Sequence, residues 1–225
     1  MRFLKALLIV GMIVAWVQPL HAGAWPRGKG NIFASSSASF TWPKGRAFEY
    51  PDIYGSTYVE YGLGNRLTMG LDIGSPDATR PSKLKAIAFM RYTLSTAQSR
   101  HQFALDFGAG KNLGNGMLRL GASYGTGLQL MERSGWLSIE SHILYDIKFW
   151  KRTQNLDATL GINLDRGKLM ALLSAYRAPT GQSTFSFTPS YAHELSSARH
   201  LEIGVTFDLS RGVDPALKLG IWQKF

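Results

Sequence analysis

Apolar and polar residues alternate with a period of two along most of the chain. In 201–209 every odd position is apolar, whereas glutamate, glycine, threonine and aspartate fill the even positions. The same alternation runs through 67–73, 156–164 and 137–149, the last of which is interrupted only at Ser141. Successive side chains of a β-strand point to opposite faces, so this period predicts strands with one apolar face.

Twelve such segments are predicted, separated by turn sequences rich in glycine, asparagine, aspartate and proline. The predicted spans are 30–41, 53–62, 66–74, 83–94, 100–109, 117–127, 136–149, 154–164, 168–176, 183–195, 200–209 and 216–225. An even number of strands of about ten residues is typical of bacterial membrane barrels. The chain is therefore predicted to be an all-β, transmembrane, antiparallel, up-and-down β-barrel of about twelve strands.

One segment does not follow the alternation. Residues 169–173 are apolar on both parities, so the orientation of the predicted strand 168–176 is not determined. A barrel of ten strands is therefore the alternative. With both chain ends in the periplasm, the connectors that face outside are expected to be somewhat longer than the others.

Alternation alone does not separate a membrane barrel from a soluble one, which turns its apolar face inward. Aromatic residues gather near the predicted strand ends, where the interfacial girdles of a membrane barrel lie. These residues are Trp25, Trp42, Tyr50, Tyr54, Phe149, Trp150, Trp222 and Phe225. Their positions favour the membrane version.

The N-terminal residues have the layout of a secretory signal. A basic start is followed by an apolar stretch at 6–17, which is too short to span a bilayer. Small residues leave two cleavage positions open, after Ala22 or after Ala24. We expect a signal peptide at 1–24, a single barrel domain at 25–225, and export to the bacterial outer membrane.

The last predicted strand carries the most specific local pattern. Leu217, Leu219, Ile221 and Phe225 share one parity, from which only Gln223 departs. This pattern resembles the carboxy-terminal signature of outer-membrane proteins, in which the terminal aromatic is the assembly signal. The expected partners are therefore the outer-membrane assembly machinery, the lipid bilayer and lipopolysaccharide.

Composition and charge narrow the chemistry. The chain has no cysteine, which excludes disulfides, thiolate metal sites and cysteine nucleophiles. Its 25 basic and 15 acidic residues give a formal charge of +10, but the basic residues are scattered, mostly near predicted strand ends. Scattered charge is typical of contact with anionic lipid headgroups rather than of nucleic-acid binding. No nucleic-acid partner is expected.

Three segments resemble a known family. The mature start GAWPRGKG at 23–30, the stretch YVEYGLGNRLTMG at 58–70 and the block LDATLGI at 156–162 are similar to outer-membrane proteins labelled for a role near meta-pathway phenol degradation. The family has no established catalytic residues to carry over. The resemblance implies a barrel fold, an outer-membrane location and transport of apolar solutes.

One constellation invites a catalytic reading. Ser138, Glu140, His142 and Asp146 share one face of a predicted strand, and a serine, a histidine and a carboxylate together suggest a hydrolase. Residues two apart on a strand are about 6.6 to 6.8 Å apart, too far for direct contact between a nucleophile and its base. Outer-membrane phospholipases place histidine and serine two residues apart, whereas residue 144 here is leucine. We therefore expect no enzyme.

The polar parity is instead predicted to line the lumen as a ladder of paired charges. The candidate residues are Arg66, Asp72, Asp106, Arg119, Ser138, Glu140, His142, Asp146, Asp157, Glu194, Glu202 and Asp208. No cofactor or metal site is expected, because the histidines lack metal-ligand spacing. Three functions stay open: a passive channel or carrier for small, apolar solutes, a structural or interaction barrel with a filled lumen, and, most remotely, a lipid hydrolase.

Overall fold

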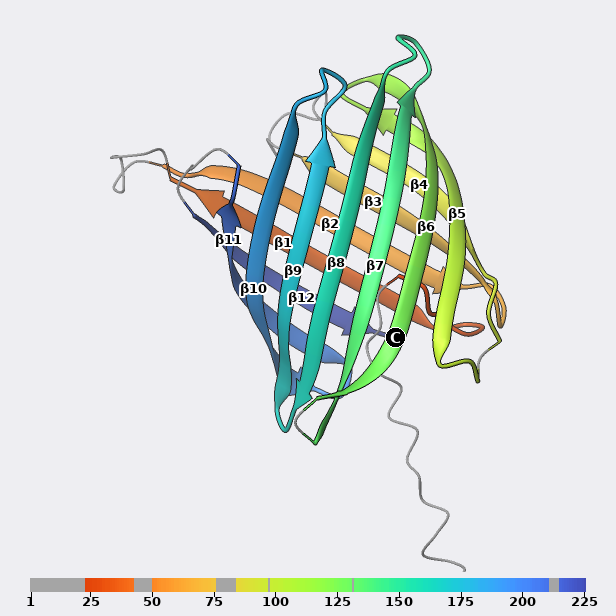
Figure 1. The fold of residues 1–225 in the computed structure, drawn as a ribbon, viewed down its shortest axis with the longest axis vertical. Coiled ribbons are helices and arrows are strands. Elements are labelled where there is room, and N and C mark those ends of the chain that lie inside the picture. The colour runs from red at the N-terminus through yellow and green to blue at the C-terminus, as the bar shows by residue number, and fades with distance from the viewer. Residues whose placement is uncertain (1–22, 43–49, 76–83, 97, 131, 211–214) are drawn as a thin grey trace, which may run out of the picture.

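The computed structural model describes residues 23–42, 50–75, 84–96, 98–130, 132–210 and 215–225. Its strands are β1 (Ile32–Thr41), β2 (Asp52–Gly62), β3 (Leu67–Ser75), β4 (Lys85–Thr93), β5 (His101–Asn112), β6 (Asn115–Leu130), β7 (Arg133–Asp146), β8 (Arg152–Leu164), β9 (Gly167–Arg177), β10 (Ser183–Ser196), β11 (Arg199–Asp208) and β12 (Ala216–Lys224). Each strand pairs antiparallel with the next, and β12 pairs with β1, so the sheet closes (Figure 1). The prediction of a twelve-stranded up-and-down barrel is confirmed, and the ten-strand alternative is wrong.

The outer surface of the barrel is apolar. On β5, Leu105 and Phe107 are 53% and 57% exposed, whereas Asp106 between them is 4% exposed. The same contrast holds on β11, where Leu201 and its alternate neighbours face outward and Glu202 is buried. A closed sheet with an apolar exterior satisfies its backbone hydrogen bonds internally, as a bilayer requires. The fold is therefore a transmembrane barrel.

Among the described residues, no helix is long and apolar enough to cross a membrane. The predicted signal peptide lies almost entirely outside the described residues, which begin at Gly23.

The hairpin between β5 and β6 is tighter than predicted. The predicted spans leave residues 110–116 between the two strands, but both strands continue to a two-residue turn at Leu113 and Gly114. These residues have φ angles of 51° and 84°, the left-handed conformation that two-residue hairpin turns favour. The strand pairing across this hairpin therefore extends further than the predicted spans.

Strand β9 resolves the segment whose orientation was undetermined. Leu169 and Leu173 face outward and are about half exposed, whereas Met170 is buried on the inner face and Leu172 lines the lumen. Full pairing of β9 with both neighbours fixes this register. The apolar residues on both parities therefore serve the lipid on one side and the lumen on the other.

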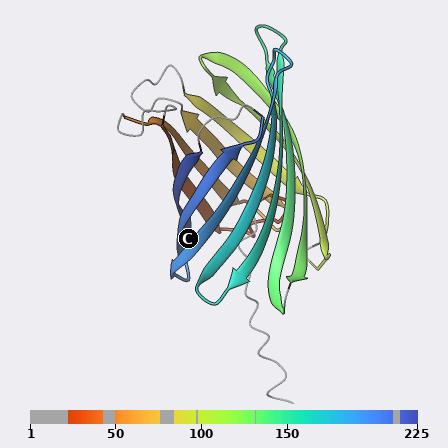
Figure 2. The ribbon, with the colours of Figure 1, turned by 60° about the vertical axis from the view of Figure 1, so that its left-hand side comes forward.

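The barrel has two unequal ends. Both β1 and β12 reach the terminal end, where Ile32 and Phe225 exchange backbone hydrogen bonds, and the other rim is called here the opposite end. Figure 2 shows that the strands run obliquely between these ends. Connectors at the opposite end include 42–51 and 76–84, whereas most at the terminal end are short, as at 165–166. The expected difference in connector length is confirmed.

Candidate functional site

The segment before β1 lies inside the barrel. We call residues Gly23–Arg27 the luminal strap, because Ala24 is fully buried and the strap is bound by inward-facing side chains of several strands. Arg91 Nη1 donates to the Gly23 carbonyl at 2.8 Å, and Thr93 Oγ1 donates to the Ala24 carbonyl at 3.3 Å. The strap therefore occupies part of the lumen near the terminal end.

The middle of the strap is held by apolar contact. Trp25 packs against a buried cluster of Trp136, Met170 and Ala192, which come from β7, β9 and β10. Its indole ring also lies directly over Gly125 of β6, where any Cβ would overlap the ring. A residue without a side chain is thus needed on β6 for the indole to approach the wall.

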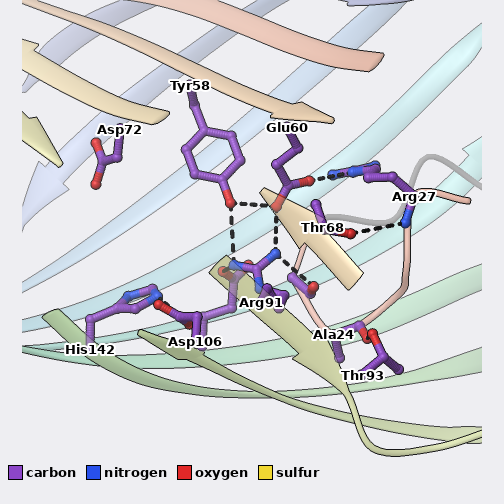
Figure 3. Close-up of polar contacts among 12 residues, drawn as sticks. Ala24, Arg27, Tyr58, Glu60, Thr68, Asp72, Arg91, Thr93, Asp106 and His142 are labelled. Atoms are coloured by element: carbon purple, nitrogen blue, oxygen red, sulfur yellow. Dashed lines mark hydrogen bonds and ion pairs between the residues drawn. The ribbon is translucent and has the colours of Figure 1, made fainter. Parts of the chain in front are cut away.

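The end of the strap is held by charge. Glu60 is fully buried and pairs with Arg27 Nε of the strap. Its Oε1 accepts hydrogen bonds from Arg91 Nη1 at 2.5 Å and from the Tyr58 hydroxyl at 2.6 Å (Figure 3). The backbone N–H of Arg27 also donates to Thr68 Oγ1 at 3.4 Å. We call Arg27, Tyr58, Glu60 and Arg91 the Glu60 cluster.

A second network lies further along the lumen. Arg119 Nε donates to Asp106 Oδ1 at 2.7 Å, and Arg119 Nη1 lies 3.3 Å from Asp72 Oδ2. Lys85 Nζ lies 2.9 Å from Asp72 Oδ1. Arg119 Nη2 is 2.5 Å from His142 Nε2, which must accept because a guanidinium has only donors. His142 therefore joins the same network.

The space beyond the strap is a cavity of about 420 Å³ with two unlike sides. Its ionic wall consists of Asp72, Lys85, Arg119, Glu140, His142 and Asp157. Its more apolar wall holds Phe33, Trp136, Met170, Leu172 and Trp222, with serine and threonine hydroxyls and the Glu202–Lys218 ion pair among them. A molecule in this cavity would meet a dense charge network on one side and mainly apolar side chains, beside one ion pair, on the other.

The cavity continues toward the opposite end. A second space of about 510 Å³ is lined by Asp72, Lys85, Arg119 and His142, which line the first cavity as well. It also reaches Leu113 in the β5–β6 turn at the opposite rim. The ionic wall thus extends from the centre of the lumen to that rim.

The structure gathers most of the lumen residues predicted from sequence. Asp72, Asp106, Arg119 and His142 form one network, described above. On β7 and β8, Glu140 lies directly opposite Asp157 in the strand register. Asp157 accepts hydrogen bonds from Ser174 Oγ at 2.5 Å and Asn155 Nδ2 at 2.6 Å.

Two further predicted residues face the lumen apart from this network. Ser138 is buried and lies beside Gly23 of the strap. Glu202 belongs to the other side of the barrel, where Lys218 Nζ lies 2.9 Å from its Oε1 and Trp222 Nε1 donates to its Oε2 at 3.1 Å.

Four predicted lumen residues lie at the ends of the barrel instead. Arg66 and Glu194 are exposed at the terminal end, where Arg66 belongs to a connector and Glu194 is near the end of β10. Asp146 and Asp208 accept backbone hydrogen bonds from the turns that follow β7 and β11, from Lys148 in the first case. All four lie at or beyond the last residues of the strands, too close to the rims to line the lumen.

The predicted aromatic girdle is wrong in part. Trp25 and Trp222 pack inside the barrel, and Tyr54 lines the second cavity. Each of these aromatic residues lies near a strand end, as a girdle residue should. Its side chain, however, faces the inside of the barrel and not the lipid. Phe149 and Trp150 are exposed at the opposite end, as a girdle requires.

Sequence reasoning missed the Glu60 cluster and the apolar wall. Asp72 was predicted to face the lumen, and the register pairs it with Tyr58 of β2. Glu60 lies two residues after Tyr58 and points to the same face, so strand parity could have placed Glu60 inside. On β4, however, Ile87 and Phe89 are buried and share the inward parity with Arg91. When the inner face of a strand is also apolar, the alternation does not show which face points into the barrel.

The geometry does not support the hydrolase hypothesis. Ser138 lies against the strap, whereas His142 interacts with Arg119 and, at 3.6 Å, with Asp106. The two side chains therefore belong to different networks. No group of three or more potential metal ligands occurs in the part of the chain that the structure describes.

The fold is similar to solved outer-membrane proteins. An outer membrane channel from Pseudomonas putida F1 aligns with a TM-score of 0.54 at 14% identity, covering 93% of this chain and 100% of that one. A mutant porin of Rh. blastica aligns with a TM-score of 0.39 at 10% identity, covering 76% of this chain and 55% of that one. No protein-family profile and no curated protein matches the sequence. The family resemblance therefore stays a prediction, while the barrel fold is shared.

Proposed function

We propose that the chain forms a passive channel of the bacterial outer membrane for small solutes that carry both a polar group and an apolar or aromatic part. One observation supports this most: the lumen holds a cavity of about 420 Å³ whose two sides differ in polarity. Binding pockets for small molecules combine apolar walls with a few placed polar groups in the same way. The proposal sharpens the apolar solutes expected from sequence into amphipathic ones.

The luminal strap sets how wide such a channel is. Arg27 attaches the strap to the side of the ionic wall by its ion pair with Glu60. Trp25 attaches it to the other side by packing against the apolar cluster around Trp136. A solute would pass beside the strap at the terminal end, or the strap would move. Loosening both ties is therefore expected to increase flux.

Osmotic swelling of proteoliposomes tests the channel. The wild type is expected to admit amino-acid-sized solutes and exclude a trisaccharide, and the double variant Trp25→Ala/Arg27→Ala is expected to admit both faster. The lipid-facing variant Leu201→Ala is the matched control and should behave as wild type. Heat-dependent gel mobility verifies that each barrel is folded. Swelling by neither wild type nor the double variant would contradict a channel.

A structural barrel with a filled lumen is the second candidate, and one observation favours it. The Glu60 cluster and the strap together fill the terminal end, where Glu60 is 0% and Arg91 1% exposed. Under this alternative the wild type would not swell with any of these solutes. The same experiment thus separates the two functions.

The proposed location follows from the exterior and the last strand. Phe225 is 66% exposed, and its backbone closes the barrel against Ile32. We propose that Phe225 is recognised by the outer-membrane assembly machinery and that the finished barrel lies in lipopolysaccharide-containing membrane. Deleting Phe225 should reduce the folded protein in the outer-membrane fraction, whereas Lys224→Ala should not. Equal recovery of both variants would argue against this role.

A further inference from the structure

Gly23 lies in a small polar pocket inside the barrel. Its carbonyl accepts from Arg91 Nη1 at 2.8 Å, and its φ of +82° is in the left-handed region. A Cβ on Gly23 would come within 2.8 Å of both Glu140 Oε1 and Ser138 Oγ. A side chain on Gly23 would therefore be strained by the positive φ and would require Glu140 and Ser138 to move.

This geometry also locates the nitrogen of Gly23. The nitrogen and the Cβ position of one residue are about 2.5 Å apart, so the nitrogen lies no more than about 5 Å from Glu140 Oε1. A rotation of the Glu140 side chain spans the remaining gap to an ion pair. The nitrogen of residue 23 is thus within reach of the carboxylate.

Glu140 has capacity for a second cation. Its Oε2 lies 3.6 Å from Arg91 Nη2, while Arg91 Nη1 is committed to Glu60 at 2.5 Å. The Glu140 side chain is 20% exposed, so its carboxylate is largely removed from water. A partly desolvated carboxylate that shares its only described cation gains from another positive charge nearby.

We propose that export cleaves the bond between Ala22 and Gly23 and that the new α-ammonium group of Gly23 binds Glu140 inside the lumen. In this step water is consumed, the C–N bond breaks, Ala22 keeps the new carboxylate and Gly23 keeps the nitrogen as an amine. That amine takes up a proton, since α-amino groups are largely charged near neutral pH. The pairing does not depend on whether a solute crosses the barrel.

The alternative cut, after Ala24, is favoured by the small-x-small pattern of residues 22–24. That cut would remove two residues that the barrel binds. Ala24 is fully buried, and the carbonyls of Gly23 and Ala24 satisfy Arg91 and Thr93. Their loss would remove the described acceptor of Thr93 Oγ1 and one of the two acceptors of Arg91 Nη1, which would keep Glu60. A mature barrel avoids this cost when Gly23 is its first residue.

Intact-mass measurement of the full protein purified from outer membranes tests the cleavage, and a mass beginning at Gly23 is expected. The pairing is tested by the rate at which an α-amine-selective reagent modifies the folded protein. Glu140→Gln should raise that rate about fivefold, the factor expected for one partly exposed ion pair. Glu202→Gln, whose carboxylate pairs with Lys218, is the matched control and should leave the rate unchanged.

A mass beginning at Trp25 would overturn the proposal. A mass beginning at Gly23 with equal labelling of wild type and Glu140→Gln would overturn the pairing. Ser138→Ala provides a second variant if the glutamine protein does not fold, and it should also speed labelling, because the Ser138 hydroxyl lies beside the same residue.

Discussion

The two walls of the lumen use the inward face of the sheet in opposite ways. On the ionic wall, Arg119 joins Asp72, Asp106 and His142 in one network. On the apolar wall, Trp136 and Met170 are buried against each other, and hydroxyl groups and a single ion pair, Glu202–Lys218, supply the polarity nearby. The outward faces of the same strands are mostly apolar. Lipid therefore constrains the outside of the barrel to one chemistry, whereas the lumen is divided between two.

The largest expected effect comes from the buried charge beside the ionic wall. Glu60→Leu should lower the free energy of unfolding by about 3–5 kcal/mol, because it leaves Arg27 and Arg91 without their carboxylate. Glu202→Leu on the other side should cost only about 1–2 kcal/mol, since Lys218 is partly exposed. Denaturant titration in lipid vesicles measures both. An equal loss of unfolding free energy in the two variants would mean that the ion pairs on the two sides contribute equally to stability.

The next effect concerns the apolar wall. Trp136→Ala should lower the free energy of unfolding by about 2–4 kcal/mol, since the indole packs among Met170, Ala192 and the strap. The lipid-facing Leu201→Ala is the matched control and should cost about 1 kcal/mol or less, because lipid can fill the vacated space. If both variants lost the same stability, Trp136 would have no special packing role.

A smaller effect is expected on ion selectivity. Asp157 lines the cavity and has hydrogen bonds from Ser174 and Asn155 but no ion pair with a described residue. Asp157→Asn should lower the cation-to-anion permeability ratio about twofold, as expected when a charged side chain lining a pore is neutralised. Reversal potentials in a salt gradient measure this ratio. Thr188→Val, on the same cavity but uncharged, should leave it unchanged, and a shift of similar size there would contradict the assignment.

The smallest effect is expected from an ion pair outside the lumen. Arg133 and Asp165 lie 2.8 Å apart with side chains 43% and 88% exposed. Water and salt screen such a pair, so Arg133→Ala should leave the free energy of unfolding almost unchanged. The same titration that measures Glu60→Leu measures this variant. A loss of stability comparable to that of Glu60→Leu would show that burial does not determine how much an ion pair stabilises this barrel.

The fold was predictable because lipid demands an apolar outward set on every strand. Leu201, Ile203 and Phe207 identified one outer face directly from their spacing, and the strand count followed from repeating it. The lumen obeys no such demand. Phe89 and Met170 face inward although both are apolar, so alternation gave no direction for β4 and left β9 undetermined.

The candidate site was predictable only in its polar half. Asp106 stands out as a charge between Leu105 and Phe107, Glu140 shares its parity with His142, and this parity placed both carboxylates inside. Trp25 and Trp222 gave the opposite signal, because an aromatic residue near a strand end also suits the membrane interface. The luminal strap has no strand period at all. Its position depends on Arg27 meeting Glu60, a contact between residues 33 positions apart.

The most direct test of the two-sided lumen compares two zwitterions of similar size, phenylalanine and glutamine, in proteoliposome swelling. They share the same charges and differ in whether their side chain suits an apolar wall. The account predicts faster swelling with phenylalanine in the wild type and loss of this preference in Trp136→Ala. Equal rates for the two amino acids in the wild type, or a faster rate for glutamine, would contradict it.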